Sequence, residues 1–131
     1  MASENPGQVV TFPCVSTGIR QYSFVNISTA GNVIKPLVDG HTVGVTQTGT
    51  TGSTVDPKAI SVMISGISKL VCSTASTIGV GQIVAAATSG NAKIMVAAAI
   101  PAGQIVAGSS GGAGRVLSVL IAGVGASTAT I

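Results

Sequence analysis

The segment Ile78-Gly-Val-Gly-Gln-Ile-Val-Ala85 recurs 22 residues later as Ile100-Pro-Ala-Gly-Gln-Ile-Val-Ala107, with six of the eight positions identical. Each copy reads as a turn, a strand Gln-Ile-Val-Ala, a Gly/Ser turn and a return strand that opens with a cation. The repeat therefore predicts one β-hairpin used twice, over residues 78–98 and 100–121. Two copies are too few for a solenoid, so paired hairpins inside one compact β-domain are expected.

The chain before the repeat also consists of short apolar runs separated by Gly, Ser, Thr and Asn. A turn signal every 8–12 residues or so is typical of an all-β sandwich or barrel. The expected strands are residues 22–27, 33–37, 41–45, 60–64, 67–72, 82–87, 93–98, 104–107 and 115–122. The last of them is apolar on both faces, so it is expected to lie centrally in its sheet or to be covered by another subunit.

One of these strands has a helical alternative. Asp56-Pro57 is a fair N-cap and first helical position. Only nine residues separate this cap from Gly66, however, and they are rich in Ile and Val. Because β-branched residues favour strands, a strand is expected over residues 60–64.

The composition is unusual for a soluble domain of 131 residues. Charged residues make up 7% of the chain, against roughly 25% in an ordinary soluble protein. Hydrophobic residues make up 46%, and the aromatic residues are Tyr22, Phe12 and Phe24. Charge is depleted at the core of protein interfaces. The composition therefore indicates that much of the folded surface contacts other protein chains.

The charge pattern and the hydropathy exclude several classes of protein. The net charge of +3 comes from dispersed residues, whereas nucleic-acid binding needs concentrated positive charge. No apolar stretch reaches 18 residues, and residues 1–7 have neither the basic nor the apolar region of a secretory signal. We therefore expect synthesis and assembly in a cytoplasm, with no nucleic-acid partner and no membrane.

Residues suited to catalysis are scarce. His41 is the only histidine, and no nucleophile motif such as GxSxG accompanies it. Turn roles account for Asp39 and Asp56, and residues 111–115 lack the pattern of a phosphate loop. Cys14 and Cys72 lie in apolar runs and are interpreted as buried thiols, although the sequence leaves open whether they pair. We expect no enzymatic activity, no metal and no cofactor.

The first nineteen residues differ from the rest of the chain. Asn5-Pro6-Gly7 is a turn signal, and Pro13 interrupts the apolar run at residues 9–15. Residues 1–19 are therefore expected to form an extended N-terminal arm with little core of its own, and residues 20–131 a β-rich domain. The apolar groups that this arm would offer to a neighbouring chain are Val9, Val10, Phe12 and Val15.

After the arm come, in order, an aromatic strand, a turn with its following strand, a GV segment, two hairpin starts and a final strand. They are Tyr22-Ser-Phe-Val25, Gly31-Asn-Val-Ile34, His41-Thr-Val-Gly-Val45, Gly81-Gln-Ile-Val84, Gly103-Gln-Ile-Val106 and Gly114-Arg-Val-Leu-Ser-Val-Leu120. This order resembles that of the capsid decoration (cement) proteins of tailed bacteriophages. The resemblance covers about residues 20–121, and the near absence of charge departs from many of these proteins.

The resemblance implies a small β-barrel or β-tulip-like domain that forms a homotrimer where major capsid proteins meet. The chain would then be a structural virion protein on the outer capsid surface, assembled in the host cytoplasm, with its arm clipping capsid subunits together. The arm residues Val9, Val10, Phe12 and Val15 would make the capsid contacts. The alternative is a receptor- or glycan-binding surface module, such as part of a head fibre. With no Trp and one Tyr, the chain offers few rings for stacking on sugars.

Overall fold

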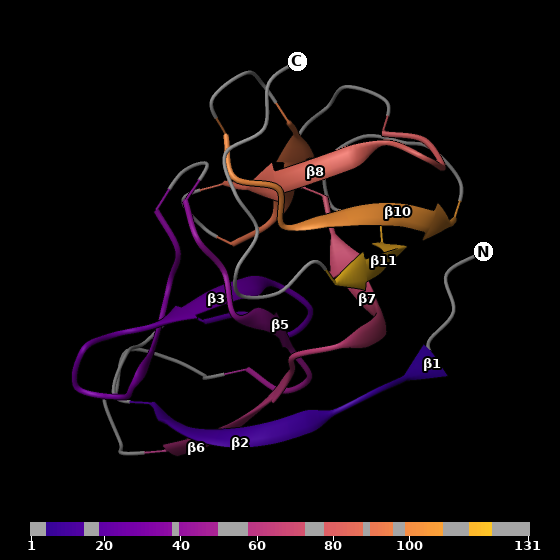
Figure 1. The fold of residues 1–131 in the computed structure, drawn as a ribbon. Coiled ribbons are helices and arrows are strands. Elements are labelled where there is room, and N and C mark those ends of the chain that lie inside the picture. The colour runs from indigo at the N-terminus through magenta and orange to yellow at the C-terminus, as the bar shows by residue number, and fades with distance from the viewer. Residues whose placement is uncertain are drawn as a thin grey trace.

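The computed structural model describes residues 5–14, 19–37, 40–49, 58–72, 78–87, 90–95, 99–108 and 116–121. These residues form strands, turns and loops and no helix, so the predicted all-β class is confirmed. Accordingly, no described helix has the length and apolar character needed to span a membrane. The strands are arranged in two sheets, with most of the first above the second in Figure 1.

The first sheet has six strands and the second has five, and every strand pairing in them is antiparallel. The six-stranded sheet runs, in spatial order, β1 (Asn5–Pro6), β7 (Gly66–Val71), β11 (Val116–Ile121), β10 (Gly103–Ala107), β8 (Ile83–Ala86) and β9 (Ala92–Ile94). The five-stranded sheet runs β2 (Val9–Cys14), β6 (Lys58–Met63), β5 (Gly44–Thr46), β3 (Phe24–Ile27) and β4 (Val33–Ile34).

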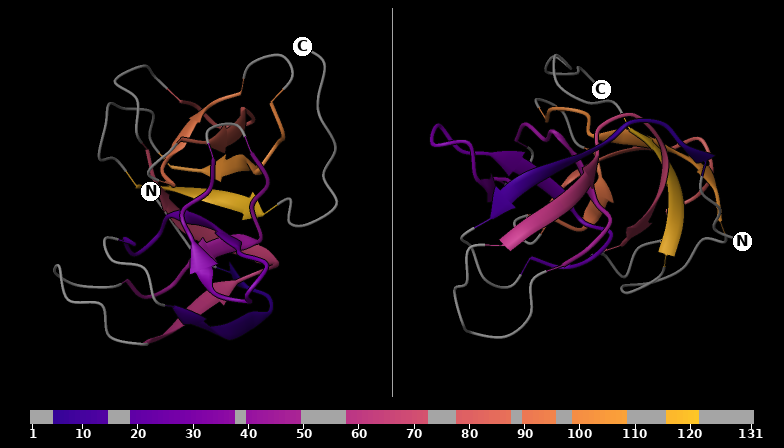
Figure 2. Two further views of the ribbon diagram at one scale, coloured as in Figure 1. Left: turned by 90° about the vertical axis from the view of Figure 1, so that its left-hand side faces the viewer. Right: turned by 90° about the horizontal axis from the view of Figure 1, so that it is seen from below.

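Both sheets are curled, as the two further views in Figure 2 show, but neither closes into a barrel. In the six-stranded sheet, an isolated bridge joins Cys72, just after β7, to Ala92 in β9. In the five-stranded sheet, the thiol of Cys14 in β2 lies 3.8 Å from the carbonyl oxygen of Val33 in β4. These contacts bring β7 close to β9 and β2 close to β4, but no continuous ladder of backbone hydrogen bonds joins either pair of strands. The barrel form of the fold prediction is therefore wrong, and the chain consists of two open, curled sheets.

Each copy of the sequence repeat is a hairpin. In the first copy β8 pairs with β9, and in the second β10 pairs with β11. The first strands of the two hairpins also pair with each other, with Gln104 opposite Ile83 and Gly103 opposite Val84. The spatial order β9-β8-β10-β11 is thus symmetric, and an approximate twofold axis passes between β8 and β10. The final strand β11 lies between β10 and β7, in the central position that its apolar sequence predicts.

Two glycines at the same position of the repeat have different roles. Gly81 lies in the turn before β8, where its φ of +92° is a conformation that glycine adopts without strain. Gly103 lies inside β10, between β8 and β11. A Cβ on Gly103 would be 2.5 Å from Cγ2 of Val119 and 2.7 Å from the carbonyl oxygen of Leu120. The second copy needs glycine because the neighbouring strand β11 leaves no room for a side chain.

Two hydrophobic clusters stabilise the sheets. The first core, which contains Val84, Ile105, Leu117 and Val119, lies against the six-stranded sheet. Phe24, Val45 and Met63 of the five-stranded sheet are buried in the same cluster, so the two sheets share it. The second core lies on the other side of the five-stranded sheet and consists of Cys14, Ile19, Val25, Val33, Ile60 and Val62.

The N-terminal segment differs from the extended arm that the sequence predicts for residues 1–19. The strand β2 pairs with β6 over its whole length, from Val9 opposite Met63 to Cys14 opposite Lys58. Cys14 and Ile19 are buried in the second core. Pro13 does not interrupt the strand, because β2 is the edge of its sheet and a missing N–H can face outward there.

The segment after Asp56-Pro57, for which the sequence allows a helix or a strand, forms the strand that was expected. Lys58–Met63 forms β6, with β2 on one side and β5 on the other. Ile60 and Val62 alternate with Ser61 along it and are buried in the second core. Apolar residues two positions apart are buried together in a strand, whereas a helix would separate them by about 200°.

The substitution Gly103→Ala tests the crowding in β10. The added methyl group must displace Val119 or the β11 backbone, so the free energy of unfolding should fall by about 1–3 kcal/mol. Gly79→Ala is the matched control, since nothing lies within 4 Å of its Cβ; its effect should stay within about 0.5 kcal/mol. Urea denaturation measures both, and equal stabilities of the two variants would contradict this account.

Candidate interaction surfaces

The described residues contain no group of three or more His, Cys, Asp or Glu side chains that could hold a metal ion. His41 is exposed. Asp39, Asp56 and the glycine-rich residues 111–115 lie outside the described residues. Two candidate surfaces for contact with another macromolecule can be built from the described strands.

The first surface is the outer face of the six-stranded sheet, which carries exposed hydrophobic side chains. Ile83 in β8 and Leu120 in β11 are 43% and 45% exposed. Both lie opposite Gln104 of β10, so the three side chains form one row across three strands. The row continues to Ile67 of β7, which pairs with Leu120. Directly paired residues point to the same face of a sheet, so this face presents to solvent a strip of apolar side chains with the polar Gln104 in the middle.

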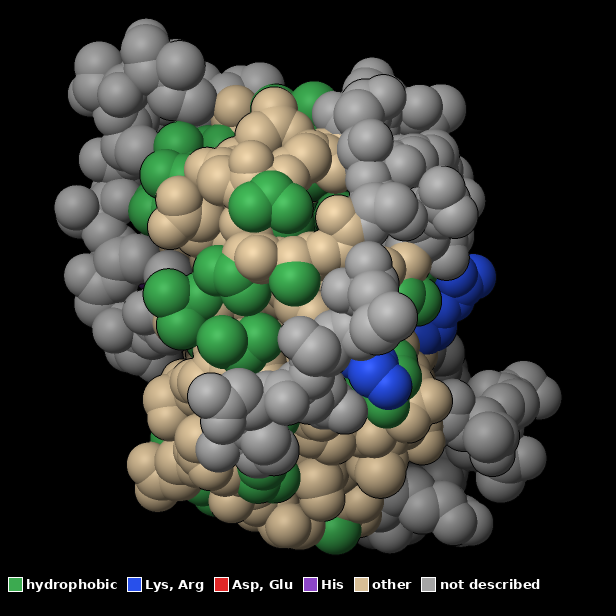
Figure 3. All heavy atoms as spheres, turned by 90° about the vertical axis from the view of Figure 1, so that its right-hand side faces the viewer, with side chains coloured by type: hydrophobic (Ala, Val, Ile, Leu, Met, Phe, Trp, Pro, Cys, Tyr) green, Lys and Arg blue, Asp and Glu red, His purple; other side chains and the backbone are tan. Residues whose placement is uncertain are grey.

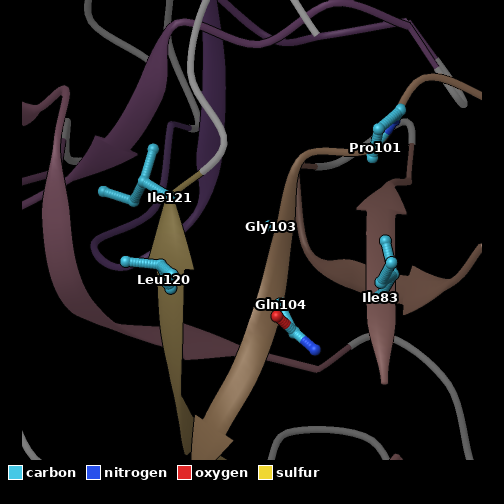
Figure 4. A pocket seen from close by; sticks show the side chains of 6 residues that line it. All are labelled: Ile83, Pro101, Gly103, Gln104, Leu120 and Ile121. Carbon is cyan, nitrogen blue, oxygen red and sulfur yellow. The ribbon is translucent and has the colours of Figure 1, made fainter. Parts of the chain in front are cut away.

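A shallow hollow of about 200 Å³ lies within this strip. Its lining side chains, shown in Figure 4, come from β8, β10, β11 and the segment before β10. They are Ile83, Pro101, Gly103, Gln104, Leu120 and Ile121. The Gln104 amide donates a hydrogen bond of 3.0 Å to the carbonyl oxygen of Gly81, which holds its polar end against the turn.

The lining of the hollow has no ionisable group, so it offers no acid, base or charged ligand for chemistry. It suits an apolar side chain from another protein. Figure 3 shows that hydrophobic side chains also gather over the middle and left of one side of the molecule, with Lys or Arg side chains to their right. Contiguous exposed apolar surface of this kind marks interaction sites in soluble proteins.

The second surface is the strand β2, which contains the predicted contact residues. Val9 is 45% exposed. Val10 is half-buried, and Phe12 packs against the second core. Val15 lies outside the described residues. The structure therefore places Val9 on one face of β2 and Val10 and Phe12 on the other, and it does not bring them together as one contact patch.

The sequence contained a signal for part of the first surface. Val116 and Leu120 form the second apolar face of the final strand, and both are exposed in the structure, at 39% and 45%. Ile83 was missed as a surface residue because it adjoins Val84 in an unbroken apolar run, where the pattern does not tell inside from outside. The hollow depends on which strands are neighbours, and the sequence carried no direct signal for it.

Comparisons with protein-family models and with curated proteins find no match for this chain. Among solved structures, the two-sheet fold is shared with a module of a bacteriophage head fibre. That structure is the head fibre gp8.5 N base of bacteriophage phi29, which matches with a TM-score of 0.68 over 88% of this chain and 95% of that chain. The two sequences are 13% identical, so the likeness establishes the fold.

The two cysteines give a test of how the cores are packed. The side chains of Cys14 and Cys72 are both buried, and they belong to different cores. Burial also raises the pKa of the Cys72 thiol, because it disfavours the thiolate. In the native protein at pH 8, neither cysteine should react with a chromogenic thiol reagent on the timescale of a free thiol. Both should react after denaturation in guanidinium, and fast reaction without denaturant would contradict the described packing.

Proposed function

We propose that this chain is a structural protein of a tailed-phage head, which binds the outer surface of the capsid and stabilises the shell without catalysis. The observation that carries the proposal is the shared fold with a phage head fibre base. The near absence of charged residues supports it, because a surface with so few ionic groups is suited to being covered by other protein.

The mechanism of stabilisation would be mass action. A subunit that binds the expanded shell, and not its separated parts, stabilises the shell by the free energy of binding. A permanent complex of this kind needs an interface of about 2,000 Å² or more, or about 1,000 Å² from each side. The chain exposes 6194 Å², so about a sixth of its surface would be sufficient.

The proposed partners are the major capsid protein and further copies of the chain in a homotrimer, on virions assembled in the host cytoplasm. The outer face of the six-stranded sheet, with its hollow, is one surface suited to such contacts. The strand β2 is another, where Val9 is the exposed member of the four proposed contact residues. The side chains of Val10 and Phe12 would support this strand from inside rather than touch the capsid.

The second candidate function is that of a head-fibre base. The phi29 structure favours it specifically, since that protein is itself described as the N base of a head fibre. A fibre base must attach a projecting chain to the shell, and it need not stabilise the shell. Both functions require binding to the outside of the head. They differ in whether this binding stabilises the shell.

Binding to emptied, expanded heads of the parent phage tests what the two candidates share. The purified protein should co-sediment with the heads and saturate at a fixed ratio to the capsid protein. It should remain in the supernatant with unexpanded proheads, whose lattice differs. Absence of binding to any head form would overturn both candidates.

Heat disruption of the heads separates the two candidates. A cement protein should raise the temperature at which emptied heads break by several degrees, because bound subunits add their binding free energy to the intact shell. A fibre base should bind and leave that temperature unchanged. Heads incubated with an unrelated small β-protein provide the control.

A further inference from the structure

The strand β2 is the one long edge strand among the described residues. The other sheet edges are β1 and β4, with two residues each, and β9, with three. The strand β2 has six residues and forms the edge of the five-stranded sheet beside β6, along the lower rim in Figure 1. An edge strand exposes unpaired backbone N–H and C=O groups, which are a template for pairing with another chain.

The register shows which backbone groups of β2 point away from the sheet. The Ile64 N–H donates a hydrogen bond of 2.9 Å to the carbonyl oxygen of Gln8, just before the strand. Hydrogen-bonded pairs alternate along an antiparallel ladder, so Val10 and Phe12 bond to β6 in the same way. Val9 and Thr11 therefore direct their N–H and C=O groups outward, and Pro13 directs its C=O outward.

Pro13 fits this pattern, because its ring nitrogen occupies an outward position where the sheet needs no donor. The approach of β4 to Cys14 lies at the far end of the strand. The backbone of Val9 and Thr11 is thus the open part of the edge. Among the described residues, no hydrogen bond to Val9 or Thr11 is found outside the β2–β6 ladder.

The exposed side chains of β2 do not protect this edge from pairing with another strand. Val9, Thr11 and Pro13 are exposed, and none is charged. Monomeric β-proteins usually protect such edges with lysine, with bulges, with proline or by keeping the strand very short. Pro13 protects only one end, and six residues is an ordinary length for a paired strand.

We propose that β2 is an acceptor edge, onto which an extended, uncharged segment of the capsid protein adds as a further antiparallel strand. The inference rests on the proposed function and names its mode of attachment. The guest strand would donate to the carbonyls of Val9, Thr11 and Pro13 and accept from the N–H groups of Val9 and Thr11. Main-chain bonds supply the affinity in strand addition of this type.

A second copy of this chain fits the edge less well than a strand without proline. If two β2 strands paired about Thr11, the carbonyl of each Val9 would face Pro13 of the other copy. Proline has no N–H, so both carbonyls would remain without a donor. A capsid segment without proline satisfies them, and this difference favours the capsid protein as the occupant.

Thr11→Pro tests the edge, because it removes an outward N–H that the β2–β6 ladder does not use. Its capsid affinity should fall at least about tenfold through the lost bond and an unpaired partner carbonyl. Its thermal midpoint should stay close to that of the unmodified protein, as Pro13 is already tolerated at an equivalent position. Thr11→Val is the matched control; it keeps the N–H and should bind heads normally.

Hydrogen exchange on the unmodified protein gives a second readout that does not depend on the variant folding. On binding to heads, the amides of Val9 and Thr11 should exchange at least about tenfold more slowly. The amides of Val10 and Phe12, already bonded to β6, should be protected in both states.

The outcomes separate this inference from the proposed function. If the unmodified protein binds heads while Thr11→Pro binds equally well and the two amides show no protection, the acceptor edge is refuted and capsid binding stands. Protection of Val9 and Thr11 in the free protein, together with a dimer in solution, would assign the edge to a second copy and overturn the capsid assignment. No binding to heads would remove both.

Discussion

The packing of Phe24, Val45 and Met63 into the first core is the contact on which the rest of the domain depends. These residues come from β3, β5 and β6 of the five-stranded sheet, yet they are buried with side chains of the six-stranded sheet. Their chain neighbours Val25 and Val62 are buried in the second core. Because successive residues of a strand point to opposite faces, the five-stranded sheet buries side chains on both of its faces, against the six-stranded sheet on one and among its own curled strands on the other.

This packing bears on where a partner could bind. Two surfaces built from the described strands are accessible, namely the outer face of the six-stranded sheet and the edge at β2. The first presents apolar side chains such as Ile83 and Leu120, and the second presents backbone groups. The two surfaces are complementary in kind, since apolar contact gives affinity without direction, whereas backbone pairing fixes orientation and register.

Much of the fold could be predicted from local signals. The repeat predicted two hairpins, and the apolar faces of the final strand predicted its central position, because periodicity and repetition are properties of the chain itself. That the sheets stay open, and that β2 is an edge strand of one of them, could not be predicted. Pro13 signals a break unless the strand is known to be an edge, and edge position is decided by partners more than 40 residues away in sequence. The hollow depends in the same way on which segments are neighbours in space, since Pro101 and Leu120, which both line it, are far apart in sequence.

The low charge has a consequence for how such a subunit would find its place on a shell. Charged proteins are steered to their partners over distances near a Debye length, about 10 Å. With nine charged residues spread along 131, this chain has little long-range steering. On the proposed function, selectivity would then arise at contact, from the shape of the apolar face and from the register at β2. Both require a partner surface that is already ordered. An assembled lattice presents such a surface repeatedly and in one geometry, whereas a free capsid subunit need not, and on this physical ground the chain would act late, on a shell already formed.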